Sequence, residues 1–293
     1  MKFPSNSVFK ILFFLIIFIF VETIFTQENK VKITSVIPWG INKGEIGSSS
    51  VPELQHLGTF PTAFLSFYVY DDKIYLLDTM NNRVNIYKQD KIDKTVSVSN
   101  CIKEYNKNVK GAKELSLEDI YVSNGNIYVA MYGILLKISE ASSQCNILNY
   151  RDKGLGWAQA KRVYEYKKYF IIYTNVDERY ICISKKKYQI TKCPDSVKKF
   201  HAIIIDDDTA DINNGFFLIM ASDIKVLVKN LVDNKVLAIF NLDESIFENQ
   251  EFGYENYFRY ANNKLYFFKS DKKGVTFFSQ EPEKLSLKKK KKP

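Results

Sequence analysis

The chain has 293 residues, 46% of them hydrophobic, and carries a formal net charge of +9 with only two histidines. Five of the positive charges lie in the run Lys288–Lys292, so the rest of the chain is only weakly basic. Arginine is scarce among the basic residues. This argues against a nucleic-acid-binding surface, because bidentate phosphate recognition favours arginine.

Residues 1–26 have the plan of a secretory signal peptide. Lys2 and Lys10 precede an unbroken apolar run, ILFFLIIFIFV, from Ile11 to Val21. This run is shorter than the roughly 20 apolar residues of a membrane-spanning helix. We therefore expect export to the cell exterior or the periplasm, followed by cleavage. An uncleaved signal anchor is the alternative, because ETIFTQEN, from Glu22 to Asn29, offers only a poor cleavage site after Thr26.

Residues 27–287 are long enough to form one domain with a sizeable core. The lysine-rich residues 288–293 are expected to form a disordered, solvated tail. Contact of this tail with anionic lipid or polymer is the alternative.

A polar turn followed by a strand-forming run recurs five times within residues 27–287. Irregular spacing of such repeats is typical of propeller blades joined by variable loops. Helical periodicity is nearly absent, which argues against an α/β enzyme fold. The equivalent positions are Ile74, Ile127, Phe170, Phe216 and Leu265, with steps of 53, 43, 46 and 49 residues.

Each repeat is predicted to contain four strands, except the last, which has three. The predicted strands, in chain order, are Phe64–Tyr70, Lys73–Asp78, Arg83–Lys88 and Thr95–Ile102; Leu117–Ser123, Asn126–Met131, Ile134–Ser139 and Cys145–Tyr150; Lys161–Lys167, Tyr169–Thr174, Arg179–Lys185 and Tyr188–Cys193; Phe200–Asp206, Gly215–Ala221, Ile224–Asn230 and Lys235–Leu242; and Tyr254–Ala261, Lys264–Ser270 and Gly274–Gln280.

The strand missing from the fifth repeat is expected at the other end of the chain. The segment KVKITSVIP, from Lys30 to Pro38, is rich in β-branched residues and has no neighbouring partner strand. Pairing it with Gly274–Gln280 closes the ring and leaves no unfinished blade. We expect Val31, Ile33 and Ser35 on one face of this strand. The sequence thus predicts an all-β propeller of about five four-stranded blades, closed by an N-terminal strand, with six blades as the alternative.

Two segments carry a family resemblance. VIPWGINKGEIG, from Val36 to Gly47, is followed by YVYDDKIYLLDTMNNRVNIY, from Tyr68 to Tyr87. Together they resemble the NHL-type repeat of β-propellers, in which a Trp-Gly lead-in precedes a strand pair with the pattern D-T-x-N-x-R-V.

The resemblance implies a structural role for the motif residues Trp39, Gly40, Asp78, Asn82 and Arg83. In NHL-type blades the Asp, Asn and Arg positions connect the second and third strands. There they bind turn backbone and the neighbouring blade. The tryptophan is expected at a blade junction.

Four cysteines allow three pairings. Cys182 and Cys193 bracket two short strands around a lysine turn, so they are expected to form a disulfide across a hairpin. The remaining pair, Cys101 and Cys145, would form the second. A secretory leader favours disulfides, and four buried free thiols are the alternative.

Candidates for metal or acid–base chemistry are few. Asp206 and Asp208 lie in the acidic stretch IDDDTAD, where carboxylates could bind Ca²⁺. The stretch lacks the spacing of a calcium loop, so a solvated blade loop is favoured and no cofactor is expected. His56 and His201 are expected to have core or loop roles.

The function predicted from these features is a monomeric extracytoplasmic binding or scaffold module for protein or glycan ligands, because loops on a rigid ring commonly carry binding residues. The alternative is a propeller enzyme of the lyase or lactonase type. That enzyme would need carboxylates, with or without Ca²⁺, converging from different blades on the central channel.

Overall fold

The computed structural model describes residues 31–48, 51–53, 66–108, 117–131, 133–150, 160–174, 180–195, 197, 209–213, 216–222, 225–230, 235–243 and 258–283. The expected leader (1–26) and lysine-rich tail (288–293) lie outside this part of the chain. Within it, no helix is both long and apolar enough to cross a bilayer.

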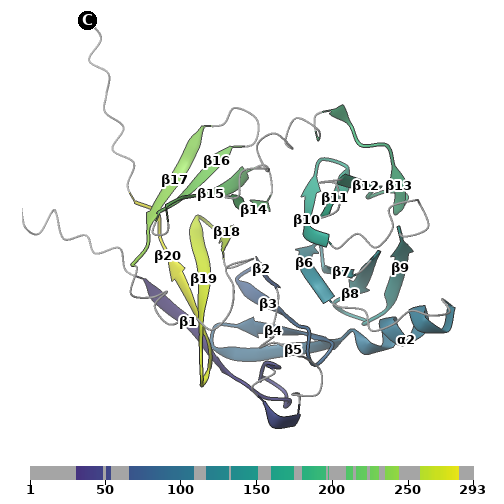
Figure 1. The fold of residues 1–293 in the computed structure, drawn as a ribbon, viewed down its shortest axis with the longest axis horizontal. Helices are drawn as coiled ribbons and strands as arrows, with labels where there is room; N and C mark the ends of the chain where they lie inside the picture. The colour runs from purple at the N-terminus through teal and green to yellow at the C-terminus, as the bar shows by residue number, and fades with distance from the viewer. Residues whose placement is uncertain are drawn as a thin grey trace, which may run out of the picture.

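In the described residues, twenty strands form five four-stranded antiparallel sheets, arranged as the blades of a ring (Figure 1). The fold is therefore the β-propeller predicted from the sequence. The strands, blade by blade, are β2 (Ser66–Tyr70), β3 (Lys73–Asp78), β4 (Arg83–Lys88) and β5 (Lys91–Ser97); β6 (Leu117–Ser123), β7 (Asn126–Met131), β8 (Ile134–Ser139) and β9 (Cys145–Asn149); β10 (Ala160–Tyr166), β11 (Tyr169–Thr174), β12 (Tyr180–Ser184) and β13 (Gln189–Thr191); β14 (Thr209–Asn213), β15 (Phe216–Ser222), β16 (Lys225–Asn230) and β17 (Val236–Asn241); and β18 (Arg259–Ala261), β19 (Lys264–Asp271), β20 (Gly274–Gln280) and β1 (Lys32–Pro38).

The fifth blade is completed by the N-terminal strand, as expected. β1 pairs antiparallel with β20, from Lys32 opposite Ser279 to Pro38 opposite Gly274. The side chain of Ile37 is buried in the hydrophobic cluster that joins the fifth, first and fourth blades. One continuous sheet therefore contains both ends of the described chain.

The expected alternation along β1 is wrong in one respect. A bulge at Thr34 shifts the register between Ile33 and Ser35. Because the bulge adds one residue, Ile33 and Val36 lie on the same face and are exposed, while Ser35 and Ile37 are buried on the other.

The fourth strand of the first blade also differs from the prediction. β5 begins at Lys91 and ends at Ser97, and helix α2 (Ser99–Asn108) follows it. Cys101 and Tyr105, one helical turn apart, are both buried. The predicted strand Thr95–Ile102 therefore ends early, because its last residues belong to an amphipathic helix.

The first strand of the fourth blade is β14 (Thr209–Asn213), not Phe200–Asp206. Asn213 pairs with Phe216, so only two residues connect β14 to β15. Such tight hairpins join the first two strands of the other blades too. The segment TADIN, which lies between the two predicted strands Phe200–Asp206 and Gly215–Ala221, thus takes the first strand position.

The tight turns follow from residues that tolerate a left-handed backbone. Asp71 and Asp72 have φ values of 51° and 56°, and Asn262 and Asn263 have values of 50° and 58°. Two consecutive positive φ angles are the signature of the hairpin turn that matches strand twist.

The first strands of the first, second and fifth blades run the same way along the central axis, since their early residues Ser66, Asp119 and Arg259 meet there. The turns between first and second strands therefore lie at the same end of the ring as those between third and fourth strands. We call this end the turn face.

Candidate functional site

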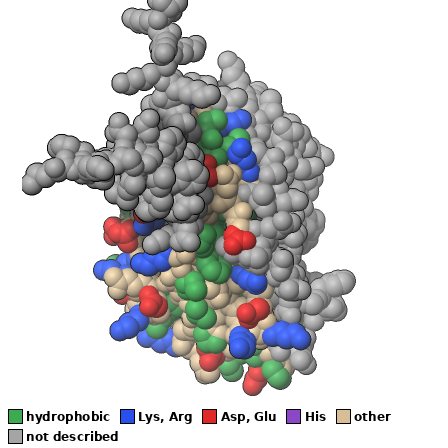
Figure 2. All heavy atoms as spheres, turned by 90° about the vertical axis from the view of Figure 1, so that its left-hand side faces the viewer, with side chains coloured by type: hydrophobic (Ala, Val, Ile, Leu, Met, Phe, Trp, Pro, Cys, Tyr) green, Lys and Arg blue, Asp and Glu red, His purple; other side chains and the backbone are tan. Residues whose placement is uncertain are grey.

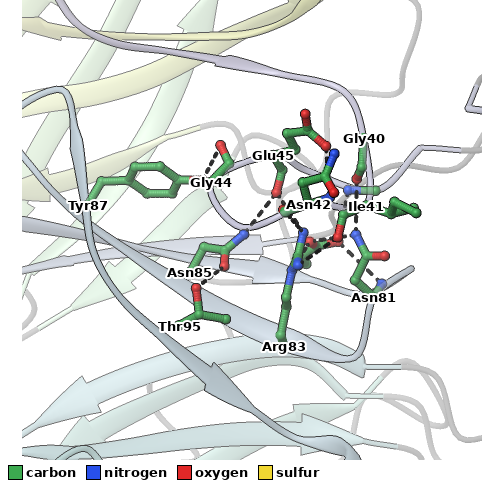
Figure 3. A network of polar contacts seen from close by, with 12 residues as sticks. Gly40, Ile41, Asn42, Gly44, Glu45, Asn81, Arg83, Asn85, Tyr87 and Thr95 are labelled. Carbon is green, nitrogen blue, oxygen red and sulfur yellow. Dashed lines mark hydrogen bonds and ion pairs between the residues drawn. The ribbon is translucent and has the colours of Figure 1, made fainter.

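The motif residues Asp78 and Arg83 face each other across the turn between β3 and β4. Figure 3 shows the Arg83 side chain pointing toward the loop that contains Ile41, Asn42 and Glu45. Arg83 Nε donates to Asp78 Oδ2 at 2.8 Å. Its two other nitrogens donate to the carbonyl oxygens of Ile41 at 3.0 Å, Asn42 at 2.8 Å and Glu45 at 2.9 Å. One side chain thus binds three backbone carbonyls of the connection between β1 and the first blade.

Asp78 is completely buried and accepts hydrogen bonds from both sides of this junction. Gly47 N donates to its Oδ1 at 3.0 Å and Asn81 Nδ2 to its Oδ2 at 2.9 Å. Asn81 Nδ2 also lies 3.2 Å from the carbonyl oxygen of Gly40. A side chain at Gly40 would collide with the carboxylate of Glu45.

Two contributors to this cluster were missed in the sequence. Asn85 Nδ2 donates to Glu45 O at 3.0 Å, and the Tyr87 hydroxyl donates to Gly44 O at 3.3 Å. Arg83, Asn85 and Tyr87 are alternate residues of β4, so their side chains share one face. That period of two was the signal that could have identified them.

The motif residues Asn82 and Trp39 form hydrogen bonds of their own, apart from the Asp78–Arg83 ion pair. Asn82 has a φ of 50°, and its carbonyl accepts a hydrogen bond from Val98 N at 2.9 Å. Trp39 Nε1 donates to Asp271 O in the turn of the fifth blade at 2.7 Å. Each of these hydrogen bonds lies within one blade, that of Asn82 in the first and that of Trp39 in the fifth.

A second polar cluster lies at the centre of the ring. Asp119 of β6 and Arg259 of β18 are buried, and Arg259 Nη2 lies 3.2 Å from Asp119 Oδ1. Ser66 Oγ of β2 donates to the same oxygen at 2.5 Å, and Val163 N of β10 donates to Oδ2 at 2.6 Å. Four blades therefore meet at one carboxylate.

The central cluster has a structural role, because its hydrogen bonds join strands of different blades. Both oxygens of Asp119 accept hydrogen bonds. Arg259 also donates to the carbonyls of Phe67 at 2.8 Å and Phe258 at 3.1 Å. Within the described residues, no group of three acidic, histidine or cysteine side chains is placed to hold a metal. The one signal available in the sequence was a charged residue inside an otherwise apolar or aromatic strand.

Both expected disulfides are formed. Cys182 and Cys193 have a Cα–Cα distance of 5.2 Å, and Cys101 and Cys145 one of 5.8 Å. Cys182 lies opposite Thr191, so Cys193 reaches it from just beyond the end of β13. The second bridge fastens α2 to the outer strand of the second blade. Two disulfides fit an oxidising compartment.

The third blade carries a dense basic group on the turn face. The β10–β11 turn and the β12–β13 turn lie side by side, since Lys185 N donates to Lys168 O at 3.0 Å. We call this group the lysine–tyrosine surface. Its members are Lys167, Lys168, Lys185, Lys186, Lys187, Tyr166, Tyr169 and Tyr188.

Two tyrosines of this surface lie close to the ammonium groups of two of its lysines. Lys167 Nζ lies 5.1 Å from the ring centre of Tyr166, and Lys168 Nζ lies 5.5 Å from that of Tyr169. These distances suit cation–π contacts. The Tyr188 hydroxyl donates to Leu135 O of the second blade at 3.1 Å, and burial raises the pKa of Tyr188 above its usual value.

Among the described residues, one of the five lysines forms an ion pair: Lys185 pairs with Glu165. Lys167, Lys168, Lys186 and Lys187 are exposed. The corresponding turns of the first blade mix both signs, with Asp71, Asp72 and Asp90 beside Lys73, Lys88 and Lys91. The surface therefore has a positive charge density that the matching turns of the first blade lack.

The sequence analysis treated Lys185–Lys187 only as the turn of a disulfide hairpin and did not single out Lys167 and Lys168. The available signal was the presence of lysines in both turns of one repeat. The candidates Asp206, Asp208, His56 and His201 lie outside the described residues.

Comparison with protein-family models gives no match, and neither does comparison with curated protein sequences. Among solved structures, the chain is similar to the glutaminyl cyclase of Myxococcus xanthus, with 7% identity over 87% of this chain and 97% of that one, at a TM-score of 0.48. It is also similar to BamB of Moraxella catarrhalis, with 12% identity over 73% of this chain and 56% of that one, at a TM-score of 0.32. A third similar structure is Sqt1 of Saccharomyces cerevisiae, with 9% identity over 75% of this chain and 60% of that one, at a TM-score of 0.36.

The chain therefore spans less than two thirds of the length of BamB and of Sqt1. The likeness to the NHL-type repeat stays a resemblance of the two quoted segments. The propeller fold rests on the sheets of this chain.

Proposed function

We propose that the protein is an extracytoplasmic binding module that holds an acidic protein or glycan against the lysine–tyrosine surface. The observation that carries this proposal is the set of exposed lysines on two adjoining tight turns. Cation–π contacts restrain the side chains of Lys167 and Lys168, and the hydrogen bond from Lys185 N to Lys168 O joins the two turns. Both reduce the freedom that is lost when a ligand binds. The leader and the two disulfides support a location outside the cytoplasm.

The surface suits an extended anionic ligand. Its lysines come from two parallel hairpin ends, so carboxylate or sulfate groups spaced along a chain can each meet an ammonium group. The neighbouring Cys182–Cys193 bridge restrains the outer hairpin. The ring supplies a rigid base, because the second strands β3 and β7 are almost wholly buried.

The experiment measures binding of heparin, as a sulfated glycan, and of a polyglutamate peptide, as an acidic protein segment. All chains carry Lys288–Lys292 replaced by glutamine, so that the terminal run does not contribute. Two double variants test the surface: Lys167→Gln with Lys168→Gln, and Lys186→Gln with Lys187→Gln. Each should weaken the binding of at least one of the two probes by about tenfold or more at low salt.

The matched control is Lys88→Gln with Lys91→Gln, which removes the same charge from the corresponding turn of the first blade. This variant should bind as the parent does. Equal losses in the control and the third-blade variants would show that only net charge matters, and the proposal would then fail. Absence of binding to both probes would also reject it.

A further inference from the structure

Both ends of the described chain leave the propeller at the same place. Lys32, at the start of β1, is paired with Ser279, close to the end of β20. The described chain continues from there only to Glu283, whose N donates to Ile239 O at 2.9 Å. The apolar leader and the lysine run, which are far apart in sequence, are therefore attached to neighbouring points.

The strand at this place has an unusual outer surface. Ile33 and Val36 are 58% and 65% exposed, and the bulge at Thr34 puts them on one face. Ile41 follows in the next loop and is 44% exposed. In the described part of the chain, these are three of the four large hydrophobic residues that are exposed, the fourth being Leu237.

Lysines border this apolar pair at both ends of the strand. Lys32 lies at its start, and Lys272 and Lys273 lie in the turn beside Pro38; all three are exposed. On this side of the molecule, Figure 2 shows hydrophobic side chains in a strip, with both basic and acidic side chains around it. We call β1 with the β19–β20 turn the closing edge.

The closing edge is poorly suited to pairing with a strand of another protein. The bulge interrupts the regular spacing of its backbone groups, and Pro38 lacks an N–H. Exposed aliphatic side chains between lysines instead match the boundary between lipid headgroups and acyl chains.

The sequence on either side of the described chain fits the same partner. Lys288 follows Glu283 by five residues, which span at most about 18 Å. Phe25, the last apolar residue of the leader, precedes Val31 by six residues, or about 22 Å at most. A bilayer that lies against the closing edge is therefore within reach of the lysine run, and of the leader where it is retained.

We propose that the closing edge docks on an anionic lipid bilayer, with Ile33 and Val36 at the headgroup boundary and Lys288–Lys292 bound to lipid phosphates. A polybasic run and a small apolar contact each bind membranes weakly, and the two together bind stably. β10–β13 lie on the opposite side of the ring from β1 (Figure 1). Docking by this edge thus leaves the lysine–tyrosine surface accessible.

Vesicle sedimentation tests the proposal with the chain from Gln27 to Pro293, which contains every described strand and both disulfides. We expect binding to vesicles that contain phosphatidylglycerol and little binding to phosphatidylcholine alone. Replacing Lys288–Lys292 by glutamine should weaken binding by at least about tenfold. Ile33→Ser with Val36→Ser should weaken it severalfold while thermal unfolding stays unchanged.

The control removes four lysines from the far side of the ring, through Lys167→Gln, Lys168→Gln, Lys186→Gln and Lys187→Gln. It should sediment as the parent does. An equal loss in this control would overturn the proposal, since binding would then depend on charge alone. Unchanged binding in the Ile33 and Val36 variant, together with equal binding to soluble polyphosphate, would overturn it too and would identify an anionic polymer as the partner.

Trp39 offers a second measurement, because it follows Pro38 directly on the closing edge. With Trp157→Phe, Trp39 becomes the only tryptophan. Its fluorescence should be quenched by vesicles of brominated phosphatidylglycerol. Sedimentation without quenching would reject the closing edge as the docking surface. Both tests are independent of heparin and polyglutamate binding, so either proposal can fail without the other.

Discussion

Arg259 and Asp119 form a buried ion pair that joins the last blade to the second, although 140 residues separate them. Arg259 is 2% exposed and Asp119 is 1% exposed. The first blade enters the same cluster through Ser66. The centre of the ring thus depends on contacts between strands that are far apart in the sequence.

Asp119→Ala should lower the free energy of unfolding by about 3–5 kcal/mol, because it leaves the Arg259 charge buried without its partner. Urea unfolding followed by circular dichroism measures this change. The control is Asp93→Asn, which weakens the partly exposed pair with Lys73 and should have little effect. If both variants unfold alike, the central cluster does not tie the blades together.

Two adjacent residues of β1 test ring closure. Ile37 is buried beside Val275, so Ile37→Ala should destabilise the protein by about 2–4 kcal/mol. Val36 is mostly exposed, and Val36→Ala should change stability by no more than about 0.5 kcal/mol. Thermal unfolding distinguishes them. Equal melting temperatures would mean that β1 contributes nothing to the core.

The ring could be predicted because its signals are local. Most blades have tight turns of Asp, Asn or Gly between strand-forming runs, the third blade has lysine turns, and β1 was a strand without a neighbour. The bulge at Thr34 and the helix at Ser99 could not be predicted, because tertiary packing decides both. The same holds for β14, whose short polar sequence becomes a strand only through pairing with β15.

Arg83→Ala should destabilise the junction between β1 and the first blade by about 3 kcal/mol, since Asp78 would remain buried and charged. Arg83→Lys should recover part of this loss, because lysine keeps the charge but cannot reach the carbonyls of residues 41–45 in the same geometry. Lys88→Ala, at the exposed end of the same strand, is the control. Urea unfolding of the three variants gives the ranking. If Arg83→Lys proves as unstable as Arg83→Ala, the charge at this position has no role of its own.

The motif was predictable at Asp78 and Arg83 because the resemblance covers those positions. The central polar cluster could not be predicted, because Ser66, Asp119 and Arg259 come from three different repeats and nothing in the sequence relates them. The lysine–tyrosine surface was partly visible as a lysine-rich turn. Its size emerged only when the fold placed Lys168 next to Lys185.

Tyrosines between blades should make stability depend on alkaline pH. Burial, and then the nearby Glu165 carboxylate, raises the pKa of Tyr128 to about 12. The neutral phenol is thus favoured in the folded state. Its contribution is complete below the unfolded pKa of about 10 and is lost as the pH rises to about 12.

Tyr128→Phe keeps the ring contact with Phe170, whose centroid lies 4.3 Å away, and removes the titrating hydroxyl. The fall in stability between about pH 9 and about pH 11 should therefore be smaller in this variant than in the parent. Urea unfolding at both pH values measures the difference. A parallel fall in the two proteins would assign the pH dependence to other groups.

The two disulfides should differ in their contribution to stability, because they close loops of different length. Cys101 and Cys145 are separated by 44 residues, and Cys182 and Cys193 by 11. Chain entropy predicts losses of about 4 and about 3 kcal/mol when each pair is replaced by alanines. Urea unfolding of the two double variants, with and without dithiothreitol, measures both losses. Each variant should keep sensitivity to the reductant, because one bridge remains. If the 182–193 variant is the less stable one, native packing around Cys182, which is completely buried, outweighs loop closure.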